Sequence, residues 1–151
     1  MERRIAETVA THPWLVLERA GRVAGFAYAG RHSQRPGYRW TVDVTVYVAA
    51  ADCGTGVGRR LYQALLATLR GQGFRSAFAE IVLPNAGSVR LHEAMGFEAL
   101  GTHRDIGFKL GRWRDIAYFR LALSEGAGAP EEAVPFALFR EGSAFAGIVA
   151  G

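Results

Sequence analysis

The clearest pattern in the chain is the strict alternation of apolar and polar residues over positions 40–48. Valine stands at every second position from 42 onward, and polar side chains or tyrosine stand between the valines. Successive side chains of a β-strand point to opposite faces, so a period of two is typical of a strand with one buried face. The pattern therefore predicts a strand whose second face carries Asp43, Thr45 and Tyr47.

Residues 57–70 follow a different period, because apolar side chains recur there at helical spacing. The stripe consists of Val57, Leu61, Leu65 and Leu69. This spacing predicts an amphipathic helix, and the glycines after residue 70 favour its end. A shorter helix is expected over residues 89–95, with Ser88 as its N-cap and Gly96 just after its last turn.

Shorter segments complete the predicted order of elements. Apolar runs separated by glycine, proline and asparagine predict five further strands, at residues 14–18, 23–28, 76–83, 97–104 and 113–123. Residues 2–11 are expected to form a short helix. Because residues 124–134 are rich in glycine, alanine, proline and glutamate, we interpret them as a linker. We therefore expect one domain over residues 1–123, a linker over 124–134 and a tail over 135–151.

The composition limits the classes of protein that fit. The 151 residues suffice for one domain, and no apolar run approaches the roughly 20 residues that span a bilayer. The only cysteine, Cys53, excludes an internal disulfide and gives no metal-site spacing. The net charge of +4 fits a nucleic-acid partner or a single anionic cofactor, although the arginines are scattered. We expect a cytoplasmic protein with no metal, no membrane partner and no nucleic-acid partner.

A glycine-rich turn separates the alternating strand from the long helix. It consists of Cys53, Gly54, Thr55, Gly56, Val57 and Gly58. Glycines let backbone N–H groups converge, and a helix N-terminus adds partial positive charge, so a pyrophosphate fits here beside Arg59 and Arg60. The spacing matches neither a Walker A loop nor the G-x-G-x-x-G of a dinucleotide fold. A tight structural turn with solvated arginines is the alternative interpretation.

A series of short motifs, taken in order, resembles the phosphinothricin acetyltransferases and their relatives that acetylate amino acids such as methionine sulfoximine. The motifs are Thr45-Val-Tyr-Val48, Gly56-Val-Gly58, Leu61-Tyr62, Gly73-Phe74, Leu83-Pro-Asn85, Ser88-Val-Arg-Leu-His-Glu93, Gly96-Phe97 and Gly107-Phe-Lys109 with Gly111-Arg-Trp113 and Asp115. The resemblance runs from about residue 13 to residue 123.

This resemblance implies the GNAT fold, an α/β fold whose mixed, mostly antiparallel central sheet is splayed open at its middle and flanked by helices. It also implies acetyl-CoA as the acetyl donor, with the pantetheine arm in the splay and the pyrophosphate on the turn 53–58. The other residues implied in cofactor binding are Val46, Tyr47, Val48, Arg59, Asn85 and Ser88.

The resemblance also assigns chemistry to two side chains. Asp43 stands where the family has a glutamate base, and would take the ammonium proton directly or through a water. Alternatively, its carboxylate only binds a cationic part of the substrate. His92 would protonate the departing thiolate or hydrogen-bond the sulfur, and its alternative is a histidine on the helix surface paired with Glu93 or a phosphate. Cys53 departs from the family pattern by replacing a side chain that contacts phosphate.

Substrate binding is implied for Arg35, Tyr38 and Thr45, because an arginine fork suits a carboxylate or phosphinate. Leu110 replaces a histidine of the phosphinothricin enzymes, so the expected substrates broaden to small amino acids and their analogues. A homodimer is expected as well. The alternatives are a module that binds acetyl-CoA without turnover and a protein N-terminal acetyltransferase.

The start of the sequence departs from the family pattern. The first strand, the first helix and the loop that help to wall the substrate pocket have no counterpart ahead of the matching region. The strand at 14–18 is therefore expected to be an unpaired edge unless it is covered. We expect residues 135–151 to supply a replacement strand, in cis or from a second subunit, or else to form a floppy tail.

Overall fold

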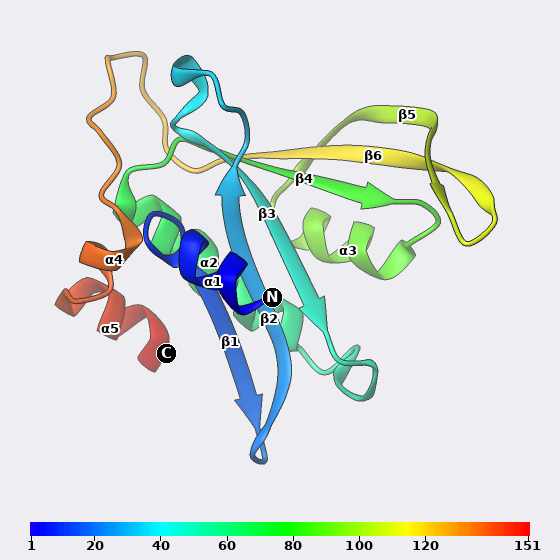
Figure 1. The fold of residues 1–151 in the computed structure, drawn as a ribbon, viewed down its shortest axis with the longest axis horizontal. Helices are drawn as coiled ribbons and strands as arrows, with labels where there is room; N and C mark the ends of the chain where they lie inside the picture. Colours follow the sequence, from blue (N-terminus) through cyan, green and yellow to red (C-terminus); the bar gives the residue numbers. More distant parts are fainter.

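A six-stranded sheet forms the centre of the computed structural model, which describes all 151 residues (Figure 1). The strands are β1 (Trp14–Arg19), β2 (Arg22–Arg31), β3 (Thr41–Val48), β4 (Ser76–Val82), β5 (Glu98–Lys109) and β6 (Arg112–Ala122). The helices are α1 (Glu2–Val9), α2 (Val57–Gln72), α3 (Ala86–Ala94), α4 (Phe136–Phe139) and α5 (Ser143–Ala150). Two 3₁₀ turns, η1 (Pro36–Tyr38) and η2 (Ala50–Asp52), flank β3.

The sheet is mixed, and it opens at its middle. Its strand order is β1-β2-β3-β4-β6-β5, and every neighbouring pair is antiparallel except β3 and β4. Those two strands pair in parallel only from Thr41–Ser76 to Asp43–Phe78. Beyond Asp43 the strands diverge, and Figure 1 shows them running apart. The expected splayed α/β fold is thus confirmed.

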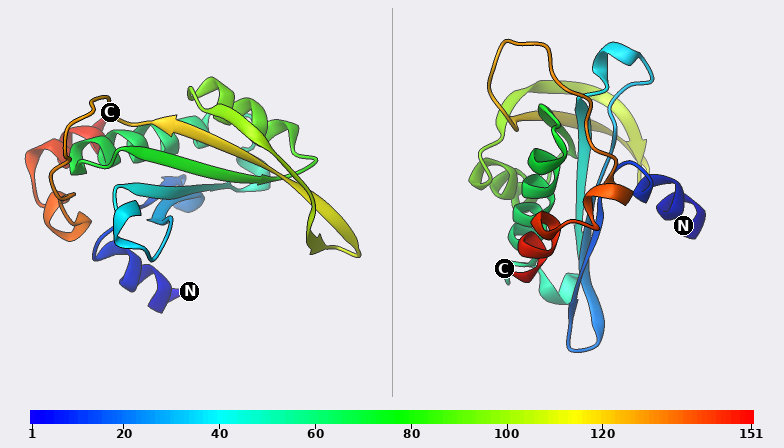
Figure 2. Two further views of the ribbon diagram at one scale, coloured as in Figure 1. Left: turned by 90° about the horizontal axis from the view of Figure 1, so that it is seen from above. Right: turned by 90° about the vertical axis from the view of Figure 1, so that its left-hand side faces the viewer.

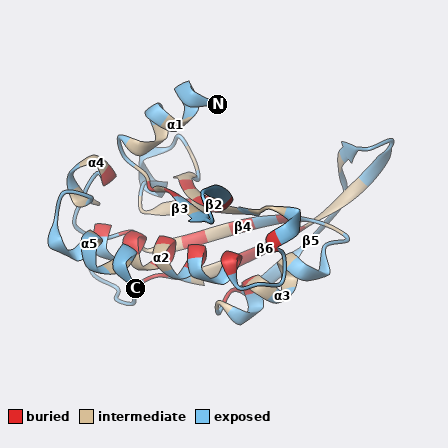
Figure 3. Cartoon of the chain, turned by 90° about the horizontal axis from the view of Figure 1, so that it is seen from below, coloured by how far each residue is buried: buried red, intermediate tan, exposed pale blue.

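Helix α2 supplies most of the core against the first three strands. Its predicted stripe is buried, together with Tyr62, Leu66 and the polar residues Thr68 and Gln72. Figure 3 shows the buried positions running along the side of α2 that faces the sheet. The helix ends at Gly73, which has a φ of 98°, and the Gly73 N–H donates to carbonyls of the last turn. The periodicity therefore located the core helix correctly.

The two faces of the sheet are covered unequally. Helices α2 and α3 lie on one face, and α1 lies on the other, as the two views of Figure 2 show. On β3, Val42 and Val44 are buried towards α2, whereas Asp43 and Tyr47 are accessible on the opposite face. The predicted alternation of β3 is therefore confirmed. No helix is both long enough and apolar enough to cross a membrane.

The expectation of a replacement strand in residues 135–151 is wrong, because this segment forms the helices α4 and α5. Phe136 is buried in the core, and its N–H donates to the carbonyl of Thr11 over 3.0 Å. The Gln72 amide donates to the carbonyls of Thr11 and Val134, which ties the segment to α2. The phenyl ring of Phe139 lies over Gly71, where a Cβ would collide with it. The segment is thus fixed on the domain and is neither a strand nor a floppy tail.

The start of helix α3 and the turn between strands β5 and β6 also differ from their predicted positions. Helix α3 begins at Ala86, because the side-chain oxygen of Asn85 accepts the Ser88 N–H over 3.1 Å; the N-cap is Asn85. Strand β5 extends beyond its predicted end at residue 104, so that β5 and β6 are joined by a two-residue turn, Leu110-Gly111. Both turn residues have positive φ, which suits the right-handed twist of a hairpin.

Candidate functional site

A cavity of about 650 Å³ lies where β3 ends and the helices α2 and α3 begin. Every residue predicted to bind the cofactor lines this cavity except Thr55 and Arg60, which was expected beside the pyrophosphate. The structure adds Asp52, Gly87, Arg90 and Leu91, which the sequence reasoning missed. The cavity therefore gathers the end of β3, the glycine turn and the start of α3, three segments that adjoin the opening between β3 and β4.

The glycine turn presents unpaired backbone donors to this cavity. Gly54 and Gly56 have φ values of 73° and 87°, a left-handed conformation that side chains with a Cβ rarely adopt. Gly56 is also the N-cap of α2, and no side chain caps the first turn of that helix. The first N–H groups of a helix have no intrahelical partner, so they are free to bind an anion. A Cβ at either glycine would meet only open space, so glycine is needed here for its conformation.

The charges that line the cavity favour an anion. Arg59 comes from the first turn of α2, and Arg90 comes from α3. Arg60, the next residue, lies elsewhere: it lines a second, mostly apolar cavity of about 600 Å³ between β1, α2 and the C-terminal helices. Arg59 and Arg90 therefore form the cationic part of the first cavity.

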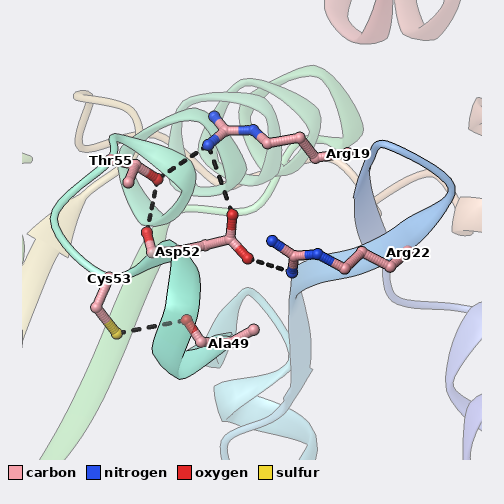
Figure 4. Close-up of polar contacts among 6 residues, drawn as sticks. All are labelled: Arg19, Arg22, Ala49, Asp52, Cys53 and Thr55. Atoms are coloured by element: carbon pink, nitrogen blue, oxygen red, sulfur yellow. Dashed lines mark hydrogen bonds and ion pairs between the residues drawn. The ribbon is translucent and has the colours of Figure 1, made fainter.

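The carboxylate of Asp52 lies beside the turn, and two arginines of the β1–β2 hairpin hold it (Figure 4). A terminal nitrogen of Arg22 donates to Oδ2 over 2.5 Å, and Arg19 approaches Oδ1 at 3.6 Å. The hydrogen bond from Arg22 is the main cause that lowers the pKa of Asp52. The carboxylate of Asp52 therefore joins the hairpin to the turn through its contacts with Arg19 and Arg22.

Thr55 belongs to the same cluster, which explains why it does not line the cavity. Its hydroxyl donates to the Asp52 carbonyl over 2.6 Å and accepts from Arg19 over 3.1 Å (Figure 4). Cys53 is exposed, and its thiol lies 3.6 Å from the Ala49 carbonyl. Sequence reasoning missed this cluster because Arg22 and Asp52 are 30 residues apart and neither belongs to a motif.

Asp43 occupies a second region, on the open face of the sheet. It sits at the last paired position of β3 and β4, about 10 Å along the strand from Val46 at 3.3 Å per residue. Its Oδ1 is 2.6 Å from Nδ1 of His32, a residue that the sequence analysis did not single out. Thr45 shares this face of β3 because it alternates in the same register. The predicted base is thus hydrogen-bonded to a histidine close to the splay.

The remaining predicted substrate residues lie in the loop after β2. Tyr38 ends η1 and is 47% exposed, and its ring lies edge-on to that of His32 with centroids 6.4 Å apart. Arg35 is exposed, and its backbone N–H donates to the Ser33 hydroxyl over 3.2 Å. Tyr38 therefore adjoins the region of Asp43, while the Arg35 guanidinium stays accessible.

His92 lies on α3 and is 3% exposed, because its ring packs in the core against Tyr62, Phe97 and Phe119. Nδ1 is 2.7 Å from the Ser88 carbonyl, which can only accept, so Nδ1 carries the hydrogen. Nε2 then accepts from the Tyr62 hydroxyl over 2.9 Å. Burial lowers the pKa of His92 and raises that of Tyr62, which keeps both groups neutral. This burial contradicts the alternative of a histidine on the helix surface. The ring does not line the cavity, and its role as a proton donor to the thiolate stays a prediction.

Known proteins share this fold and this sequence pattern. Residues 1–117 match the family model described as an acetyltransferase (GNAT) domain. A phosphinothricin N-acetyltransferase from Streptomyces viridochromogenes is 50% identical over 109 residues, which are 72% of this chain and 60% of that protein. An L-methionine sulfoximine/L-methionine sulfone acetyltransferase from Salmonella typhimurium is 38% identical over 126 residues, 83% of this chain and 73% of that protein.

A solved structure is similar as well. The phosphinothricin acetyltransferase from Sinorhizobium meliloti in complex with acetyl-CoA has a TM-score of 0.80 and 34% identity, over 92% of this chain and 78% of that one. The chain spans 60% and 65% of the length of the first two curated relatives. The family match nevertheless covers most of the chain, and the splayed sheet and glycine turn agree with it. The chain belongs to the GNAT acetyltransferase family.

Proposed function

We propose that this chain is an acetyl-CoA-dependent N-acetyltransferase that transfers an acetyl group to the amine of a small amino acid or analogue. The observation that carries the proposal is the cavity at the splay, which joins an uncapped helix N-terminus to two arginines. A pyrophosphate needs such donors. The names of the relatives support the substrate class, since they are acetyltransferases of phosphinothricin and methionine sulfoximine.

In this proposal the cavity holds acetyl-CoA along its length. The turn 53–58 and Arg59 bind the pyrophosphate, and the backbone of residues 46–48 faces the pantetheine arm. The side-chain oxygen of Asn85 is used by its own helix cap, so its amide N–H₂ remains to donate to the cofactor beside Ser88. Arg90 is added to the predicted set as a further phosphate contact.

The amine would bind on the open face of the sheet, next to Asp43. Asp43 would lie on the side of the site where the ammonium proton is accepted, and Thr45, Tyr38 and Arg35 would orient the substrate. An arginine fork matches the carboxylate that all amino acids share. The amine then attacks the thioester directly, without an acyl-enzyme. His92 is proposed to fix the start of α3 through the Ser88 carbonyl.

We propose a homodimer in the cytoplasm that acts on small molecules, without a nucleic-acid or membrane partner. Light scattering of the purified protein tests the dimer: a mass of twice 16.4 kDa supports it, and the monomer mass contradicts it.

The function is tested by binding and turnover together. Calorimetric titration with acetyl-CoA compares the wild type with Arg59→Ala and with the matched control Arg60→Ala, whose side chain lines the other cavity. Because a hydrogen bond to a charged group contributes about 1.5–3 kcal/mol, Arg59→Ala should weaken binding about tenfold or more. Arg60→Ala should bind acetyl-CoA as the wild type does. Equal affinities for the two variants would contradict the proposed cofactor site.

Thiol release from acetyl-CoA, measured with a panel of amines, tests the transfer. Release that depends on free amino acids or their analogues supports the proposal. Tight binding with no turnover on any amine would show the binding module, and turnover on peptide N-termini alone would show a protein acetyltransferase.

A further inference from the structure

The ring of His32 is held from three directions on the open face of the sheet. Its Nδ1 lies 2.6 Å from Oδ1 of Asp43 on β3. One face of the ring stacks on Phe78 of β4, with centroids 5.0 Å apart and planes at 28°. Tyr38 of η1 meets it edge-on. Because β3, β4 and η1 all contact the ring, its orientation is well defined.

The partner of Nδ1 fixes which nitrogen of the ring is basic. An ionised carboxylate has only acceptors, so the Nδ1–H of His32 donates to Asp43. The lone pair of the neutral ring is therefore on Nε2. The side chain is 35% exposed, and no hydrogen bond engages Nε2. Nε2 is thus a bare acceptor that is accessible from outside, unlike the core-bound ring of His92.

The sheet leaves space for an amine beside this pair. Gly30 is the residue of β2 directly opposite Asp43 in the antiparallel ladder, and it shares the face of Asp43 and His32. A Cβ at Gly30 would meet no atom within 4 Å. The next residue, Arg31, points to the other face, where burial mainly, and the charge of Arg31 in addition, lowers the pKa of His12. A small polar group can therefore reach Asp43 and His32 together from above Gly30.

We propose that His32 and Asp43 form a catalytic dyad, in which Nε2 of His32 takes the proton from the substrate ammonium and Asp43 orients the ring. The proposal rests on the proposed acetyltransferase function and adds a residue to it. The proton acceptor that touches the amine is His32. Asp43 acts through it as a positioning residue, and its negative charge stabilises the imidazolium that forms.

The protons balance over one turnover. The ammonium loses one proton to Nε2, and the neutral amine forms a bond to the thioester carbon. The carbon–sulfur bond then breaks, the nitrogen loses its second proton, and the thiolate takes up one proton to become the thiol of CoA. The imidazolium of His32 returns its proton to the solvent. The net products are the amide, CoA and one released proton.

His32→Gln tests the dyad with the exposed residue His103 as the matched control. His103 lies on β5 against Tyr118 and has no part in either proposed site. Since general base catalysis contributes roughly 10²–10⁴-fold, His32→Gln should lower kcat about 100-fold or more and leave the Kd for acetyl-CoA unchanged. His103→Gln should keep wild-type kcat. A wild-type kcat in His32→Gln would overturn the dyad and leave the acetyltransferase proposal standing.

Chemical rescue of a His32 variant by added imidazoles distinguishes a catalytic base from a ring that only packs. In His32→Ala, added imidazoles should restore turnover, and the restored rate should rise with the basicity of the imidazole at a fixed free-base concentration. Restoration that follows only the size of the imidazole would overturn the base role, because packing depends on shape alone.

The tautomer gives a result that needs no turnover. ¹⁵N shifts of labelled histidine should show His32 protonated on Nδ1 and bare on Nε2, and Asp43→Asn should move the hydrogen to Nε2, because the amide N–H₂ donates. A wild-type ring protonated on Nε2 would overturn the dyad whether or not an amine is acetylated. Absence of turnover in the wild type with every amine would overturn the catalytic role and the proposed function together.

Discussion

The buried contact between Tyr62 and His92 makes a prediction whose size follows from the structure. Tyr62→Phe removes only the hydroxyl that donates to Nε2 of His92 over 2.9 Å. The ring nitrogen is then left without a donor in a site that is 3% exposed. An unsatisfied buried acceptor costs about 1–3 kcal/mol, which for a chain of this length corresponds to about 2–12 °C in Tm.

Urea unfolding followed by circular dichroism measures this cost. His92→Leu should also destabilise the protein, because the Tyr62 hydroxyl and the Ser88 carbonyl lose their partner. In the double variant no polar group of the pair remains, so its loss should be smaller than the sum of the single losses by about 0.5–3 kcal/mol. Tyr118→Phe, at a half-buried tyrosine on β6, is the control and should change the free energy by less than about 0.5 kcal/mol.

The same contact predicts the direction of the pH dependence. Burial lowers the pKa of His92 in the folded state, so the unfolded chain binds more protons near that value. The contribution of His92 to stability is complete above about pH 6.5, the ordinary value, and is lost as the pH falls through the lowered pKa. His92→Leu should flatten this part of the curve. Additive single losses, or an unchanged pH dependence in His92→Leu, would refute the reasoning.

Three further substitutions test other parts of the structure. Asp52→Asn should weaken acetyl-CoA binding, because Asp52 joins the β1–β2 hairpin to the glycine turn. It should also reduce the loss of stability at acid pH, since the contribution of the lowered pKa of Asp52 is complete above about pH 4 and is lost below it. An unchanged loss of stability between about pH 5 and pH 3, measured by urea unfolding, would contradict this. Gly56→Ala should cost about 1–2 kcal/mol from its left-handed φ of 87°, whereas Gly147→Ala in α5 should not destabilise, and equal unfolding energies would be the contrary result. Gly71→Ala should displace Phe139 and speed hydrogen exchange in α4 and α5, and unchanged exchange there would show that the ring is not fixed by α2.

Much of the fold is predictable because β3 and α2 each obey a single strong period. The alternation of β3 follows from one buried face, and the stripe of α2 follows from packing on three strands. The glycine turn could also be predicted, since Gly54 and Gly56 do have the left-handed conformation that only glycine adopts readily. These features depend on short stretches of sequence, so the hydrophobic period and the positions of glycine suffice to predict them.

The C-terminal segment shows where this reasoning fails. Phe136-Ala-Leu-Phe139 is too short for its period to separate a strand from a helix. The choice is made by tertiary contacts. Phe139 packs on Gly71, and the backbone N–H groups of Phe136 and Val134 donate to the carbonyls of Thr11 and Gln72, all more than 60 residues earlier in the sequence.

In the candidate site, too, features set by local sequence could be predicted, and features set by long-range contacts could not. The residues that line the cavity come from two short segments, 46–59 and 85–91, and the motifs of both segments predicted them as parts of one site. The side-chain pairs depend on long-range contacts: His92 with Tyr62, Asp52 with Arg22, and Asp43 with His32. A histidine eleven residues before an aspartate carries no signal until the ladder of β2 and β3 brings the two together. Residue roles were therefore less predictable than residue positions.

The central claim is that this chain binds acetyl-CoA at the turn 53–58 and transfers the acetyl group to a small amino acid. The most direct measurement is thiol release from acetyl-CoA in the presence of phosphinothricin, methionine sulfoximine and unmodified amino acids, with the acetylated product identified by mass spectrometry. We expect one thiol released for each N-acetyl product, with the rate at low acetyl-CoA reduced in Arg59→Ala and unchanged in Arg60→Ala. No release above the amine-free background with any of these amines would contradict it.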